Sequence, residues 1–76
     1  MQKEKIAISS DFITVDKLLK FAGVVDSGGQ AFQLVLEGMV KLNGVSVKEK
    51  RKKIFPGDKV NIAEQIELTV IKDENL

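Results

Sequence analysis

The sequence predicts an α+β fold in which two short helices pack on a small, mostly antiparallel sheet. Apolar residues recur with a helical period between residues 15 and 36, and they alternate with polar residues from Val40 onward. Two turn signals, Asn43-Gly44 and Pro56-Gly57-Asp58, separate the alternating segments. Helices followed by hairpin-linked strands are typical of this fold class.

The first helix is expected to begin after Thr14, whose side chain is suited to an N-cap. Apolar residues in the segment 15–22 follow at positions i, i+3, i+4 and i+7, which is one stripe of an amphipathic helix. Lys17 and Lys20 fall on its polar side, and Gly23 is well placed to end it.

A second helix is expected from Ser27. The run Ser27-Gly28-Gly29-Gln30 fits a capping box, in which the serine hydroxyl and the glutamine side chain satisfy each other's backbone amides. Apolar residues in the segment 31–36, including Leu36, supply its buried stripe, and Gly38 ends it. The four-residue connection 23–26 predicts a helical hairpin or corner.

Strands are expected where the apolar period changes to two. Residues 5–8 give a weak strand signal, and residues 40–42, 45–47, 60–62 and 66–70 give clearer ones. Each of the four phenylalanines lies in or beside such an apolar pattern, so core packing is favoured over base stacking for all of them, with Phe55 the best candidate for an exception because it follows a basic run.

Composition favours a binding module over an enzyme. The chain of 76 residues is short enough for one domain, 1–76, and contains no His, Cys, Trp or Tyr. The usual general base, the soft metal ligands and the thiol nucleophile are therefore missing, and we expect no catalytic residue, metal, cofactor or small-molecule substrate. No apolar run could span a membrane or form a signal peptide, and the absence of cysteine fits a cytoplasmic location.

Positive charge is concentrated in one short segment. Lys48-Glu49-Lys50-Arg51-Lys52-Lys53 carries five positive charges and one negative, whereas the net charge of the whole chain is only +1. Such a segment attracts anions, and nucleic acid is the commonest matching polyanion. A solvated loop without a ligand is the simpler interpretation of the same run.

The order of these motifs resembles a known family. Two short helices, the second opened by the run 27–31 and closed at Glu37-Gly38, precede Val40-Lys41-Leu42-Asn43-Gly44, a basic stretch and the turn 56–60. This order is similar to that of the S-four (S4) RNA-binding domain, over about residues 13–62. The chain is hardly larger than that module, so it looks like one of the small stand-alone bacterial members.

The resemblance implies a helix pair and a basic loop that together form one RNA-binding face, with ribosomal RNA or tRNA as the partner and ribosome association left open. The family commonly carries Arg after the capping Ser and a basic residue after the following Ala. Gly28 and Phe32 stand at these positions here. We expect close contact between phosphate and the glycine amides to replace part of the missing arginine.

The candidate RNA-binding residues belong to the polar side of the first helix, the start of the second helix, the hairpin and the basic run. They are Lys17, Lys20, Ser27, Gly28, Gly29, Gln30, Lys41, Asn43, Lys48, Lys50, Arg51, Lys52 and Lys53. Among them Arg51 is the best candidate for a bidentate phosphate contact.

Other interpretations stay open at this point. Gly28-Gly29-Gln30 repeats a tripeptide used by release factors, but a lone tripeptide is a weak signal and the capping role suffices. Asp58 is favoured as a turn residue over a metal ligand. A protein-interaction module and a DNA-binding module are the alternative functions, because phosphate contacts alone do not distinguish the nucleic acids.

Overall fold

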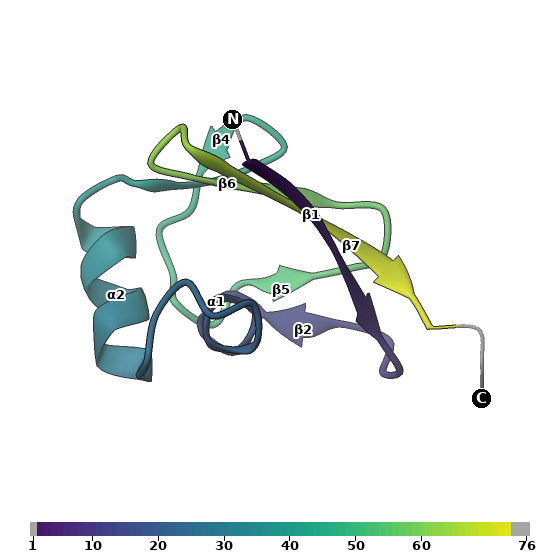
Figure 1. Cartoon of the computed structure of the whole chain (residues 1–76). Helices are drawn as coiled ribbons and strands as arrows, with labels where there is room; N and C mark the ends of the chain where they lie inside the picture. The colour runs from purple at the N-terminus through teal and green to yellow at the C-terminus, as the bar shows by residue number, and fades with distance from the viewer. Residues whose placement is uncertain (1, 74–76) are drawn as a thin grey trace.

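The computed structural model describes residues 2–73 and has two layers (Figure 1). One layer is a five-stranded sheet in the order β1-β7-β6-β3-β4. Its strands are β1 Gln2–Ile8, β3 Val40–Leu42, β4 Val45–Ser46, β6 Lys59–Ile62 and β7 Ile66–Lys72. The other layer holds α1 Val15–Phe21, α2 Gly28–Leu36 and a two-stranded sheet of β2 Ile13–Thr14 and β5 Lys53–Ile54. The predicted α+β fold is confirmed.

The sheet is mostly antiparallel, as predicted, but its longest pairing is parallel. β1 pairs with β7 along its whole length, from Gln2 opposite Ile66 to Ile8 opposite Lys72. The sequence signal covered only residues 5–8, because the first half of β1 is charged and mostly exposed. Pairing with β7 therefore extends the strand beyond what its own side chains indicate.

Both helices begin and end where the sequence predicts, but both caps differ from the prediction. Thr14 precedes α1 as expected, yet its side chain makes no capping hydrogen bond, because its hydroxyl donates to the Asp16 carboxylate. Ser27 Oγ accepts a hydrogen bond from the Gln30 amide at 3.2 Å, as expected. The Gln30 side chain, however, accepts from the Asp26 amide at 2.6 Å and not from the Ser27 amide, so the predicted reciprocal bond is displaced by one residue. Figure 1 views α1 along its axis and α2 from the side, so the helices pack as a corner.

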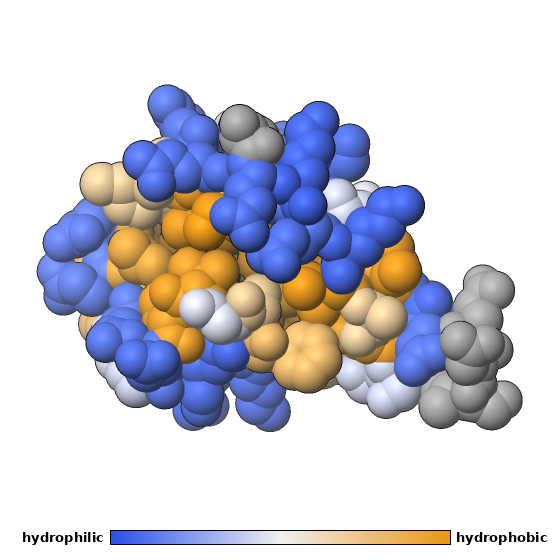
Figure 2. Space-filling model, viewed as in Figure 1, coloured by the Kyte–Doolittle hydropathy of each residue, from blue (hydrophilic) through white to orange (hydrophobic). Residues whose placement is uncertain are grey.

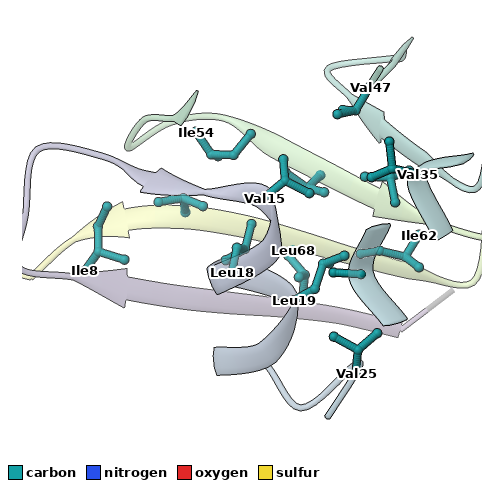
Figure 3. Packing of buried hydrophobic residues seen from close by; sticks show 14 residues of the cluster. Ile8, Val15, Leu18, Leu19, Val25, Val35, Val47, Ile54, Ile62 and Leu68 are labelled. Atoms are coloured by element: carbon teal, nitrogen blue, oxygen red, sulfur yellow. The ribbon is translucent and has the colours of Figure 1, made fainter. Parts of the chain in front are cut away.

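The core lies between the sheet and the helical layer and is aliphatic. In Figure 3 side chains of α1, including Leu18 and Leu19, point toward Leu68 of β7 and the neighbouring strands. These three leucines and Ile54 are fully buried. Burial of each such side chain contributes about 1.5–3 kcal/mol, so a few residues supply much of the stability of a chain this short.

None of the four phenylalanines packs in the core, so the expectation is wrong for Phe12, Phe21 and Phe32, whereas Phe55 is the exception that its position beside the basic run suggested. The exposed fractions are 37% for Phe12, 66% for Phe21, 40% for Phe32 and 48% for Phe55. Leu36, predicted to widen the buried stripe of α2, is also exposed. Each lies beside an apolar pattern but points away from the core, and apolar side chains accordingly reach the surface between the two layers (Figure 2).

Replacing Leu19 by Ala should lower the free energy of unfolding by about 2–5 kcal/mol, because it leaves a cavity among fully buried neighbours. Leu36→Ala is the matched control: it is the same substitution at a side chain that is 63% exposed, and it should change stability by less than about 0.5 kcal/mol. Urea unfolding of both variants measures the difference. Equal losses would contradict the assignment of α1 as the core helix.

Candidate nucleic-acid interface

The basic loop, residues 48–53, follows β4, ends on the first residue of β5 and lies beside both helices. It leaves the five-stranded sheet, passes α2 and reaches α1 before it enters β5 (Figure 1). All of its positively charged residues are exposed or half-buried. The predicted basic run is therefore a surface loop on the helical side of the sheet.

Hydrogen bonds attach the basic loop to the first turn of α1. The Val15 amide donates to the Lys52 carbonyl at 3.0 Å, and the Asp16 amide donates to the Lys50 carbonyl at 2.8 Å. The first amides of a helix have no partner within the helix. The loop satisfies two of them, and its charged side chains are thereby held next to α1, which carries Lys17 and Lys20 on its exposed side.

Two lysines of the basic loop lie over aromatic rings. The Lys50 ammonium is 5.4 Å from the centroid of the Phe32 ring, and the Lys53 ammonium is 4.8 Å from that of Phe12. Because Phe32 belongs to α2, the loop contacts both helices. Cation–π contacts at exposed positions contribute about 0.5–1 kcal/mol each. The sequence alone does not indicate these contacts, because no local pattern places a ring beside a distant lysine.

Asp16 is the acidic side chain at the junction of α1 and the basic loop. Burial alone would raise its pKa, but a hydrogen bond from Thr14 Oγ1, backbone hydrogen bonds and the positive charge of Arg51 together lower the pKa below the ordinary value. The Thr14 hydroxyl donates to the carboxylate at 2.6 Å. Asp16 therefore stays ionised at neutral pH and attracts the loop to the helix.

The start of α2 has two glycines that the fold does not require. Neither Gly28 nor Gly29 has a positive φ, and a Cβ added at Gly28 would meet no atom within 4 Å. Within residues 2–73 no acceptor is found for their amides, whereas the next amide, that of Gln30, donates to Ser27 Oγ. The first turn of α2 therefore presents the backbone amides of Gly28 and Gly29, and no side chain projects from these two positions.

Lys41 lies apart from the other candidates. Its neighbours Val40 and Leu42 face the core side, so Lys41 points to the opposite, outer face of the sheet. There its ammonium forms an ion pair with Glu64 at 3.7 Å. The structure does not bring Lys41 together with the basic loop.

Asn43 is engaged in holding two turns together. Its Nδ2 donates to Asp58 Oδ1 at 3.2 Å, and its Oδ1 accepts from the Lys59 amide at 3.0 Å. Asp58 Oδ2 accepts from the Phe55 amide at 2.8 Å, which confirms its interpretation as a turn residue. Asn43 also lines a groove of about 470 Å³ between the hairpin and the basic loop, together with Lys48 and Lys52.

The described part of the chain, residues 2–73, has no arrangement typical of a metal centre or a membrane span. Across residues 2–73, no three His, Cys, Asp or Glu side chains are close enough together to hold a metal ion. In the same part of the chain, neither helix is long and apolar enough to cross a bilayer.

Comparison with known proteins identifies the family. The family model described as the S4 domain matches residues 6–71, a wider span than the motifs at 13–62. The chain belongs to the S4 domain family. The match confirms the family prediction that was based on the order of the motifs.

A solved structure shares the fold of this S4 domain. The 30S ribosomal protein S4e from Thermoplasma acidophilum matches with a TM-score of 0.54 and 24% sequence identity. The match covers 72% of the present chain and 29% of that protein, so this S4 domain corresponds to less than a third of the length of its structural neighbour. No curated protein sequence matches.

Replacing Asp16 by Asn should destabilise the protein at neutral pH and less so in acid. Because the pKa of Asp16 is lowered on folding, its charge stabilises the fold above the ordinary value of 3.8, and this stabilisation is lost as pH falls below 3.8 through the lower folded pKa. Urea midpoints of both proteins across this range measure the effect. A stability difference that does not change with pH would show that the charge of Asp16 is not responsible.

Proposed function

We propose that this S4 domain binds structured RNA, either ribosomal RNA or tRNA, without catalysing a reaction. The observation that carries the proposal is the attachment of the basic loop to both helices, by hydrogen bonds to α1 and by the contact of Lys50 with Phe32. Family membership supports the same function. The proposed interface consists of the polar side of α1, the first turn of α2 and the basic loop.

Phosphates of the RNA backbone are the groups that this interface fits. The side chains of Lys48, Arg51 and Lys52 are exposed on the loop, and a guanidinium can donate two parallel hydrogen bonds to one phosphate. The amides of Gly28 and Gly29 can donate to another phosphate at the positive end of the helix dipole. The glycines allow the phosphate to approach the backbone closely, in place of a longer basic side chain.

Recognition by such contacts depends on the shape of the RNA. Lysine, arginine and backbone amides at phosphates fix the position of a nucleic acid but do not read its sequence. Structured RNA is commonly recognised by its backbone geometry and its 2′-hydroxyl groups. The structural neighbour is a protein of the 30S ribosomal subunit, and we extend the proposal to a ribosomal setting and hence to the cytoplasm.

Replacing Lys48, Arg51 and Lys52 together by Gln should weaken RNA binding and its salt dependence. Each phosphate contact contributes about 0.7–0.9 to the slope of log affinity against log salt, so the slope should decrease by roughly two units. Titrations of a structured RNA at several salt concentrations measure this slope. Parallel titrations with duplex DNA and single strands test the preference for structured RNA.

A matched control removes the same charge from the outer face of the sheet. Lys3, Lys5 and Lys59 alternate with core-facing residues and are exposed. Their replacement by Gln lowers the net charge equally but should leave the salt slope nearly unchanged. Equal effects of the two triple variants would reject the basic loop as the interface. Equal affinity for duplex DNA and RNA would favour DNA binding, and salt-insensitive capture of a protein would favour an interaction module.

Replacing Gly28 by Asp should weaken RNA binding about tenfold, because it places a carboxylate where the phosphate is proposed to lie. The same change should not destabilise the protein, since aspartate is favourable in the first turn of a helix and space is open there. Gly28→Ala is the control, because it adds a Cβ without charge. Unchanged affinity of the aspartate variant would eliminate the phosphate cradle.

A further inference from the structure

Two exposed phenylalanine rings lie next to each other at the end of the basic loop. The centroids of Phe12 and Phe55 are 5.9 Å apart, with an angle of 48° between the ring planes. Phe12 directly precedes β2 and Phe55 directly follows β5. The two residues are therefore brought together by the pairing of β2 with β5, although they are distant in the sequence.

The pairing of β2 with β5 also determines which way the rings point. Ile13 lies opposite Ile54, and Ile54 is fully buried in the core. Because side chains alternate along a strand, the residues on either side of this pair face outward. The outward face of the small sheet therefore carries Phe12 and Phe55. Lys53, two residues before Phe55, lies on the same outward face and belongs to the basic loop.

The backbone around both rings is held by short polar contacts. The Phe55 amide donates to Asp58 Oδ2 at 2.8 Å, and the Ser10 hydroxyl donates to the Phe12 carbonyl at 2.8 Å. Among residues 2–73 the buried side chains are aliphatic, so the core is built without these rings. They form an exposed aromatic surface at the edge of a cationic loop.

We infer that Phe12 and Phe55 form a stacking platform for an unpaired base of the bound RNA, while Lys53 contacts the adjoining phosphate. This inference rests on the proposed function. Lys53 already covers part of the Phe12 ring, at 4.8 Å, and Phe55 keeps the larger exposed fraction, 48% against 37%. The base therefore lies on Phe55, with Phe12 beside it and the ammonium within reach of the phosphate.

Charge favours a nucleotide over an apolar protein segment as the occupant. The platform borders Lys53, and the next two residues of the loop, Lys52 and Arg51, are also positively charged and exposed. A base with its phosphate offers a π-face and a negative charge at neighbouring positions, which matches rings next to an ammonium. An apolar peptide would satisfy the rings but would leave these charges without partners.

The test compares hairpin RNAs that share one paired stem. One hairpin ends blunt, one has a short unpaired adenosine tail, and one has an equally long tail of abasic nucleotides. The wild-type protein should bind the adenosine tail about tenfold more tightly than the abasic tail, because only the former can stack. A fluorescent adenine analogue in the tail should be quenched on binding.

The variant Phe12→Leu/Phe55→Leu should reduce the ratio of the two affinities to about one and abolish the quenching, while its affinity for the blunt hairpin stays unchanged. Phe21→Leu is the matched control, since Phe21 is 66% exposed and, among residues 2–73, the ring contact found is that of Phe12 with Phe55. It should keep the wild-type ratio. Thermal unfolding of each variant checks that the fold is retained.

The outcomes separate the platform from the proposed function. Equal affinity of the wild-type protein for adenosine and abasic tails, with tight binding of the blunt hairpin, would overturn the platform and leave the proposed function standing. In that case a protein partner becomes the interpretation of the exposed rings. Failure to bind any of the three hairpins at low salt would overturn both proposals.

Discussion

The attachment of the basic loop to the first turn of α1 is the interaction on which the rest of the candidate site depends. α1 has only seven residues, and an isolated helix of this length is not stable in water. Two of its first amides donate to carbonyls of the loop, and Asp16 in the same turn attracts Arg51. The hydrogen bonds that complete the first turn of α1 therefore also hold the basic loop in place, and they offset the mutual repulsion of its positive charges.

Local signals in the sequence predict the elements of the fold well. Asn43 and Gly44 both have positive φ, 50° and 89°, as the predicted hairpin turn requires. Gly23 and Gly38 follow the two helices with φ of 77° and 72°, which is the conformation that ends a helix. These features depend on a few consecutive residues, so a single sequence contains the information that specifies them.

Features that depend on distant pairing could not be predicted in the same way. The sequence does not show that β1 joins β7, because the two strands come from opposite ends of the chain. It also places Phe12 and Phe55 in unrelated segments, although the β2–β5 pairing brings their rings together. Alternation of Lys41 with Val40 and Leu42 predicts that Lys41 faces away from the core. It does not predict that the basic loop lies on the helical side of the sheet, because that depends on the path of the chain between β4 and β5.

Separation of the two faces explains how a nearly neutral chain can offer a cationic interface. The outer face of the sheet mixes charges of both signs, and Lys41 pairs there with Glu64. The molecule is about 20 Å across in its shortest dimension, whereas charges in physiological salt are screened over about 8 Å. An RNA phosphate at the basic loop would therefore respond to the nearby lysines and Arg51, and the net charge of +1 is a poor guide to the field that it meets.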